Sequence, residues 1–329
     1  MSDETGFSGR LLQHPEARNA AALERIVLAK RRIQSVLDRE IAAGRRTLEQ
    51  KISDQGPVGQ RVDPHLVGLA IMDLLETGRL KQRDVAGDPW YSNPGTSDQA
   101  AGAKIGRYAQ LHALINSGAF GNLIGDALEV VVFKTLDRLY TAQPRYAYHG
   151  SFRLSEPKNP AGRYVKVRPP KIIGSRSTLK DPDFLQFGHD SGPLYIECKN
   201  RREWLYPHHG LIKNMIIGAI DLGCTPVLIQ RRLHYTTISN FFRPAGIIAH
   251  ESYFQYYPAD KADIATVVKN RRAFGYTDVT PVEEPHPRTV KFIDDTLPRI
   301  SGPMTERWNK NKDALLAVSV RSAPPRNQL

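Results

Sequence analysis

Residues 181–200, DPDFLQFGHDSGPLYIECKN, contain two short apolar stretches that are bounded by charged residues. Asp183 stands at the start of the first stretch, and Glu197 and Lys199 close the second. Side chains two residues apart point to the same face of a strand, so Glu197 and Lys199 share one face and Cys198 takes the other. We therefore predict a two-stranded hairpin that brings the carboxylates of Asp183 and Glu197 together beside Lys199.

Two converging carboxylates repel each other unless a cation lies between them. Oxygen ligands of this kind suit hard divalent ions such as Mg²⁺ or Mn²⁺. A bound metal polarises a phosphate and lowers the pKa of its water, which are the two requirements for hydrolysing a phosphodiester. The hairpin therefore predicts a metal site suited to phosphodiester chemistry.

A third acid, Glu129, lies in residues 121–141, which have the pattern of a long helix. Glu129 shares a helical face with the apolar residues Val132, Phe133 and Leu136. Because that face is suited to packing on a sheet, we expect the carboxylate to be buried near the hairpin. The alternative is a buried glutamate paired with a structural Arg or Lys.

Pro182-Asp183, Glu197-x-Lys199 and an expected αβββαβ order over about residues 118–235 resemble the PD-(D/E)XK nuclease superfamily, which includes restriction endonucleases and Holliday-junction resolvases. The resemblance implies an α/β fold with a restriction-endonuclease-like core. It implies that Asp183 and Glu197 are metal ligands and that Lys199 orients or activates the attacking water. It also implies that Glu129 binds the metal directly or through water, and that the Cys198 carbonyl supplies another oxygen.

Gln230 ends the next β-branched run, TPVLIQ, and we expect it to support the metal ligands from a neighbouring strand.

Positive charge is concentrated in the middle of the chain, whose 329 residues carry a net charge of +12. Residues 101–250 hold 20 basic and 10 acidic side chains, whereas residues 1–100 hold 14 of each. Between Arg153 and Lys180 there are eight Lys or Arg and one acid. Such a field attracts polyanions, nucleic acid above all, and we predict that Lys166, Arg168 and Lys171 contact phosphates. The alternative is a solvated basic loop without a ligand.

Three regions are predicted from the sequence pattern. Residues 1–115 form a mainly helical N-terminal region, residues 116–257 the nuclease core, and residues 258–329, rich in proline and charge, a peripheral extension. A helix followed by a Gly/Pro-rich hairpin at 63–100 fits a winged helix or, alternatively, a small helical domain with an exposed hairpin. The neutral charge of this region favours the second interpretation.

Other features limit the class of protein. Two cysteines, Cys198 and Cys224, provide no disulfide framework, which favours a reducing compartment, and the N-terminus has no apolar signal region. No run of residues is apolar enough to span a membrane. We expect a cytoplasmic protein.

The leading functional hypothesis is a divalent-metal-dependent DNA endonuclease of the restriction or anti-invader defence type. The alternatives are a non-catalytic DNA-binding or scaffold protein on the same fold, a structure-specific resolvase or repair nuclease, and an RNA nuclease. Cutting both strands would favour a homodimer, and any ATPase, targeting or trigger function would come from a partner protein, because no nucleotide-binding motif is present.

Overall fold

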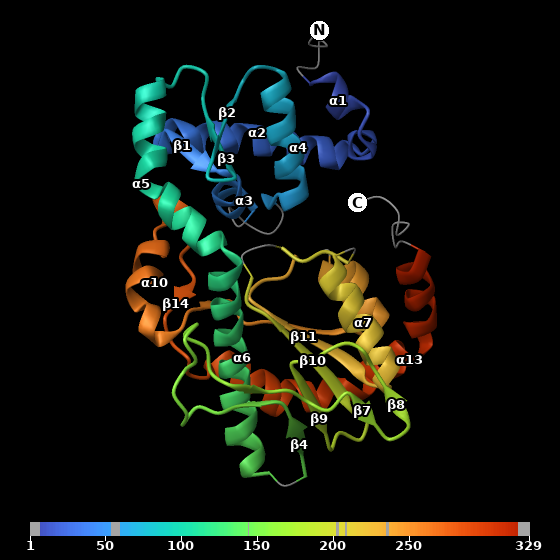
Figure 1. The fold of residues 1–329 in the computed structure, drawn as a ribbon. Helices are drawn as coiled ribbons and strands as arrows, with labels where there is room; N and C mark the ends of the chain where they lie inside the picture. Colours follow the sequence, from blue (N-terminus) through green and yellow to red (C-terminus); the bar gives the residue numbers. More distant parts are fainter. Residues whose placement is uncertain are drawn as a thin grey trace. The chain divides into compact units, whose positions relative to one another are not determined.

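The computed structural model describes residues 7–53, 60–143, 145–201, 204–207, 209–234 and 237–321, and it is a mixed α/β structure. The chain divides into two compact units, which are coloured along the sequence in Figure 1. The first unit comprises Met1–Gly121 and Asp263–Val279, and the second comprises Asn122–Ala262 and Thr280–Leu329.

The first unit is built mainly from helices whose apolar residues recur at helical spacing. In α2, for example, Ile26, Ala29, Ile33 and Leu37 are all buried, and the side chain of Asn19 caps the helix by accepting hydrogen bonds from two backbone N–H groups. The elements of its N-terminal segment are α1 (Gly9–Leu12), η1 (Pro15–Arg18), α2 (Ala20–Glu40), β1 (Ala42–Gly44), α3 (Arg45–Ser53), α4 (Pro64–Glu76), β2 (Lys81–Val85), β3 (Asp88–Ser92) and α5 (Asp98–Asn116).

The three strands of the first unit form an antiparallel sheet in the order β1-β3-β2. The hairpin predicted within residues 63–100 is the β2–β3 pair, and it follows α4 directly. Most of α4 is buried against α2 and α3, and its sequence, PHLVGLAIMDLLE, has no Lys or Arg. This helix therefore offers no cation for a nucleic-acid phosphate, and the winged-helix interpretation stays a prediction.

The second unit has a five-stranded mixed sheet in the order β12-β11-β10-β9-β4. Strands β10, β11 and β12 are parallel, whereas β9 is antiparallel to both β10 and β4. Every residue of β11 is buried, as expected for a central parallel strand. The sheet strands are β4 (Ala147–His149), β9 (Phe184–Phe187), β10 (Leu194–Lys199), β11 (Thr225–Gln230) and β12 (Ile248–Glu251).

Two helices, α6 (Gly118–Thr141) and α7 (Gly210–Leu222), cover the two faces of this sheet (Figure 1). One apolar core contains α6 residues together with Ile196 and Cys198 of β10. A second core contains α7 residues together with Tyr195 of β10. The alternation along β10 therefore places the core of α6 on one face and that of α7 on the other.

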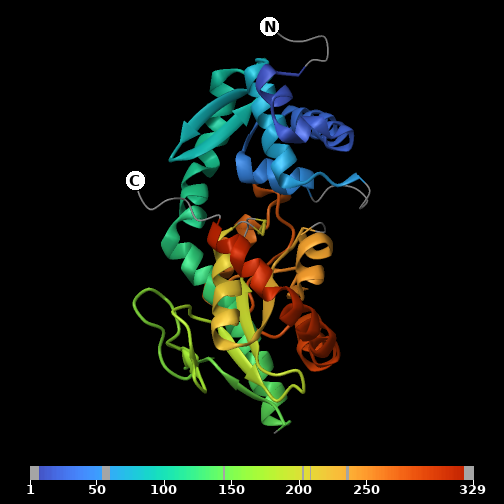
Figure 2. The ribbon, with the colours of Figure 1, turned by 90° about the vertical axis from the view of Figure 1, so that its right-hand side faces the viewer.

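A long excursion leaves the sheet between β4 and β9 (Figure 2, yellow-green). It has little regular structure and contains the basic stretch predicted to bind phosphate. Its short strands form two small antiparallel pairs: β5 (Ser151–Phe152) with β6 (Lys166–Val167), and β7 (Ile172–Ile173) with β8 (Arg176–Ser177).

The region after residue 257, predicted to be peripheral, instead contributes to the interior of both units. Phe274 is fully buried in the first unit, and Phe292, Ile293 and Leu297 belong to the core between α6 and the sheet. The prolines and charges around these residues in the sequence obscured the apolar pattern that would have predicted their burial. Its elements are η4 (Ala259–Lys261), α10 (Ala262–Val268), α11 (Arg271–Phe274), β14 (Val279–Thr280), α12 (Pro287–Lys291), η5 (Phe292–Thr296) and α13 (Leu297–Arg321). They follow η3 (Ile238–Phe242), α9 (Arg243–Ala245) and β13 (Gln255–Tyr256).

Across the described ranges, none of the helices has both the length and the apolarity that crossing a membrane requires.

Candidate active site

Asp183 is fixed at the point where β9 begins beside β10. Its backbone N–H donates to the carbonyl of Ile196 at 3.1 Å, and its Oδ2 accepts from the N–H of Cys198 at 2.8 Å. Gly150, at φ +103°, passes so close that a Cβ there would lie 2.5 Å from the Asp183 carbonyl oxygen. Only glycine suits that combination of backbone angle and close approach. The aspartate is thus held by its own strand pair and by the chain leaving β4.

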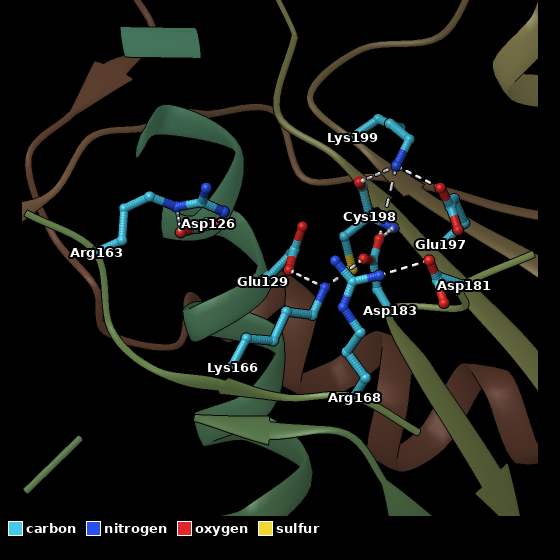
Figure 3. A network of polar contacts seen from close by, with 10 residues as sticks. All are labelled: Asp126, Glu129, Arg163, Lys166, Arg168, Asp181, Asp183, Glu197, Cys198 and Lys199. Atoms are coloured by element: carbon cyan, nitrogen blue, oxygen red, sulfur yellow. Dashed lines mark hydrogen bonds and ion pairs between the residues drawn. The ribbon is translucent and has the colours of Figure 1, made fainter. Parts of the chain in front are cut away.

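Lys199 and Glu197 extend from the end of β10 and meet Asp183, as the hairpin prediction required. The Lys199 ammonium forms an ion pair with Glu197, donates to the Cys198 carbonyl at 3.0 Å and lies 3.6 Å from Asp183 Oδ2. The structure therefore brings together all three residues of the predicted hairpin site (Figure 3).

Glu129 reaches the same site from α6, but a lysine lies between it and Asp183 (Figure 3). The Lys166 ammonium donates to Glu129 Oε2 at 2.6 Å and to Asp183 Oδ1 at 2.7 Å. This arrangement matches the alternative interpretation of Glu129, a buried glutamate paired with a lysine. It also differs from the predicted role of Lys166 as a phosphate contact, because its ammonium is bound to two carboxylates. The acid–lysine cluster therefore has five members, namely Glu129, Lys166, Asp183, Glu197 and Lys199.

The acid–lysine cluster holds three carboxylates and two ammonium groups. Burial, with a further contribution from Asp183, raises the pKa of Glu129 to about 8, although Lys166 acts against this shift. Burial and Asp183 likewise raise the pKa of Glu197 to about 7, against the influence of Lys199. Both shifts report the same fact: the two lysines do not neutralise three buried acids.

The charges at the centre of the acid–lysine cluster are stabilised by one another. For Asp183, burial would raise the pKa, but Lys199, Lys166 and the Cys198 N–H outweigh it and lower the pKa. Burial would lower the pKa of each lysine, and the neighbouring carboxylates, Asp183 foremost, raise it instead. Asp183 is therefore ionised, and both lysines carry their positive charge.

The remaining predicted phosphate contacts lie nearby on the surface. Arg168 and Lys171 both pair with Asp181, at 2.5 Å and 2.7 Å, and their side chains are 61% and 48% exposed. Other cations of the basic stretch also have acidic partners, since Arg163 pairs with Asp126 and Lys158 with Asp260. Much of the local positive charge is therefore already matched by acids.

The donor set suits Mg²⁺ or Mn²⁺ in chemistry and in charge. It offers carboxylate oxygens and the Cys198 carbonyl, and the acid–lysine cluster has one acid more than it has lysines. Its geometry, however, is not that of a formed metal site: within the described part of the chain, no three His, Cys, Asp or Glu residues are grouped so as to hold a metal ion. Between Glu129 and Asp183, the position of a bridging cation is taken by the Lys166 ammonium.

Gln230 is paired in register with Lys199 on the adjacent strand. Its Nε2 donates to the Arg232 carbonyl at 2.8 Å, and its Oε1 is buried with no hydrogen-bond partner among the described residues. Gln230 thus lies one strand from the acid–lysine cluster, but no hydrogen bond between its side chain and a member of the cluster is recorded among those residues.

Asn200, which is not among the predicted site residues, connects the end of β10 to its surroundings. Its side-chain amide donates to the carbonyls of Ile124 and Tyr256 at 2.7 Å each, and its Oδ1 accepts from the Tyr256 N–H. The residue is 4% exposed. The polar amide that directly follows Lys199 after an apolar run was the available signal, and its hydrogen bonds position β10 against α6 and β13.

No family model matches the chain, and no curated protein matches it. Among solved structures, the chain is similar to protein VC1899 from Vibrio cholerae, with 13% sequence identity and a TM-score of 0.26. The match covers 78% of this chain and 56% of the other, so the chain spans little more than half the length of that protein.

Proposed function

We propose that the second unit is a divalent-metal-dependent endonuclease that hydrolyses DNA phosphodiester bonds and has a core of the PD-(D/E)XK type. The observation that carries this proposal is the placement of Asp183, Glu197 and Lys199 at adjoining strand ends. Glu129 is joined to Asp183 through the Lys166 ammonium. Burying three carboxylates together is costly unless cations compensate them. An excess acid in such a place is explained by a function that requires a cation.

The roles of the residues follow from their positions. Asp183, Glu197 and the Cys198 carbonyl would hold the metal, with Glu129 as a further ligand or as the acceptor of a metal-bound water. The metal supplies charge stabilisation for the phosphate and lowers the pKa of a bound water. Lys199, held beside Asp183 and Glu197, is placed to orient the attacking water and to balance charge on the phosphate. Asn200 and Gly150 keep the strand ends in register.

The substrate surface in this proposal is the exposed side of the excursion between β4 and β9. Arg168 and Lys171 are exposed, and their shared partner Asp181 lies two residues before Asp183. Their cations can exchange a carboxylate for a phosphate at little cost, because both ion pairs are exposed to solvent. A restriction or defence role, a homodimer and a partner protein are further parts of the same proposal.

The experiment is cleavage of supercoiled plasmid in Mg²⁺ or Mn²⁺, read as nicked and linear products. We expect Asp183→Asn and Lys199→Met to lower the rate at least about a hundredfold, because each removes a group that acts on the reacting phosphate or water. The matched control is Lys51→Met in the first unit, where the lysine is equally shielded and pairs with Glu40 at 2.9 Å. Its folded fraction should cleave at the wild-type rate.

One observation favours a second candidate, a non-catalytic nucleic-acid-binding protein on the same fold. The Lys166 ammonium already bridges two of the acids, as a permanent structural ion pair would. In that case no divalent ion would promote cleavage of duplex, single-stranded or branched DNA, or of RNA. Asp183→Asn would then leave nucleic-acid binding and biological function unchanged.

A further inference from the structure

Lys166 differs from the other members of the acid–lysine cluster in the element that carries it. Glu129 belongs to a long helix, and Asp183, Glu197 and Lys199 belong to the sheet or border it. Lys166 lies on the two-residue strand β6. This strand belongs to the excursion between β4 and β9, which leaves the sheet (Figure 2, yellow-green). Two registered pairs, Ser151–Val167 and Phe152–Lys166, join β6 to β5. The residue that holds the acids together is thus the least firmly anchored of the five.

The oxygen atoms of Asp183 show what a metal would encounter. Oδ2 accepts from the Cys198 N–H at 2.8 Å and faces Lys199 at 3.6 Å. Oδ1 faces the Lys166 ammonium at 2.7 Å, and the same ammonium holds Glu129 Oε2 at 2.6 Å. A cation that bridges Asp183 and Glu129 must therefore replace the ammonium at both oxygens.

We propose that Lys166 is the resident counter-ion of the metal-free site and competes directly with the divalent metal for Asp183 and Glu129. When the metal enters, the ammonium leaves the two carboxylates and becomes available to a substrate phosphate at the same site. This inference rests on the proposed metal-dependent function. It makes the affinity of the site for the metal depend on one lysine of the excursion. It also accounts for the absence, within the described residues, of a ready metal-binding group.

The competition has a thermodynamic consequence for the substrate. A phosphate that pairs with Lys166 removes the ammonium from the acids, and so favours metal binding. Two ligands linked in this way strengthen each other by the same factor. Metal and nucleic acid should therefore bind cooperatively, and the cooperativity should depend on the charge of Lys166.

The principal test is the dissociation constant of Mn²⁺ by titration calorimetry, without DNA and without measuring activity. We expect Lys166→Met to bind Mn²⁺ about tenfold more tightly than the wild type, since the metal no longer has to break charge-assisted hydrogen bonds. Lys166→Arg keeps the charge and should bind no more tightly than the wild type. The matched control is Lys158→Met on the same excursion, whose lysine pairs with Asp260 and Glu283. We expect a dissociation constant within about twofold of wild type, because neither partner belongs to the acid–lysine cluster.

Folding is checked by melting each variant with and without Mn²⁺. Lys166→Met should melt at a lower temperature without metal, because it leaves three buried acids with one lysine, and Mn²⁺ should restore it. If Lys166→Met binds Mn²⁺ no more tightly than wild type while Asp183→Asn abolishes binding, the competition is disproved and the metal site stands. Equal tightening by Met and Arg would also disprove it. Absence of Mn²⁺ binding by wild type and Lys166→Met together would overturn both proposals.

A second measurement examines the linkage. The affinity of the wild type for a short DNA duplex should rise when Ca²⁺, a hard cation with oxygen ligands, is added. In Lys166→Met the increase should be smaller. An unchanged increase in Lys166→Met would show that the substrate phosphate does not act through this lysine.

Discussion

Each unit contains a buried lysine–carboxylate site, and the two sites differ in their balance of charge. In the first unit, Lys30 and Asp73 lie 2.5 Å apart with side chains 8% and 0% exposed, and the backbone N–H of Ser8 also donates to Asp73. In the second unit, the acid–lysine cluster has three carboxylates for two lysines. The first site pairs one charge with one, whereas the second leaves an acid unmatched.

The contrast shows that burial of charge does not by itself indicate a functional site. A one-to-one pair with an additional hydrogen bond satisfies its own groups and connects elements far apart in the chain, here α2, α4 and the segment before α1. An unbalanced cluster retains a proton, as the raised pKa values of Glu129 and Glu197 indicate, or binds a further cation. The imbalance, rather than the burial, supports a function for the second site.

The largest expected effect is a difference between the two sites in how much stability is lost when one acid is removed. Asp73→Ala should lower the free energy of unfolding by about 3–5 kcal/mol, because it leaves the buried Lys30 without its carboxylate. Glu197→Gln should change it by less than about 1 kcal/mol, because burial already raises the pKa of Glu197 to about 7, and two acids and two lysines remain. Chemical denaturation in the absence of divalent ions measures both. A large loss in Glu197→Gln would show that the acid–lysine cluster is balanced as it stands.

The next effect concerns metal binding. At a concentration one hundred times its dissociation constant, Mn²⁺ should stabilise the second unit by about 2.7 kcal/mol and leave the first unit unaffected. Hydrogen exchange resolves the two, because peptides from β9 and β10 should gain protection whereas those from α4 should not. Equal protection of α4 would place metal binding outside the acid–lysine cluster.

A smaller effect is the dependence of stability on pH without metal. Burial raises the pKa values of Glu129 and Glu197 from near 4.5 to about 8 and about 7, so between pH 4.5 and 8 the folded state holds more protons than the unfolded chain. Stability of the second unit should therefore fall as the pH rises through this window. Asp183, whose pKa is lowered, acts in the opposite direction, and its contribution is lost as the pH falls below the ordinary aspartate range.

Thermal melting across this window, with Glu129→Gln as the comparison, measures the dependence. The variant has lost one of the two titrating groups and should show a flatter profile. An identical slope in the variant would assign the pH dependence to groups elsewhere in the chain.

The smallest effect lies at the surface. Asp181→Asn releases Arg168 and Lys171 from their shared partner, so nucleic acid should bind a few-fold more tightly, while Lys171→Ala should reduce the salt slope of binding by about 1. Fluorescence anisotropy at several salt concentrations measures both. Weaker binding in Asp181→Asn would contradict a phosphate-facing role for these cations.

The parts of the site that the sequence predicted are those that local periodicity controls. Asp183, Glu197 and Lys199 follow from strand alternation across one hairpin, and the β10-α7-β11 order from apolar runs separated by Gly and Pro. The partnership of Lys166 with Glu129 joins residues 37 apart along an irregular loop, and no periodic signal specifies it. The core positions Phe292 and Ile293 were missed for a related reason, because their burial depends on distant elements.

The assignment of Asp263–Val279 to the first unit has a consequence for biosynthesis. Phe274 makes ring contacts with Tyr108 and His112, and the chain then turns at Gly275, whose φ of +79° suits glycine. The ribosome synthesises α5 about 160 residues before Phe274, at roughly 5–20 residues per second. The first unit therefore waits roughly 8–30 s for the ring of Phe274. Most of the second unit is synthesised during that interval, before the first unit is complete.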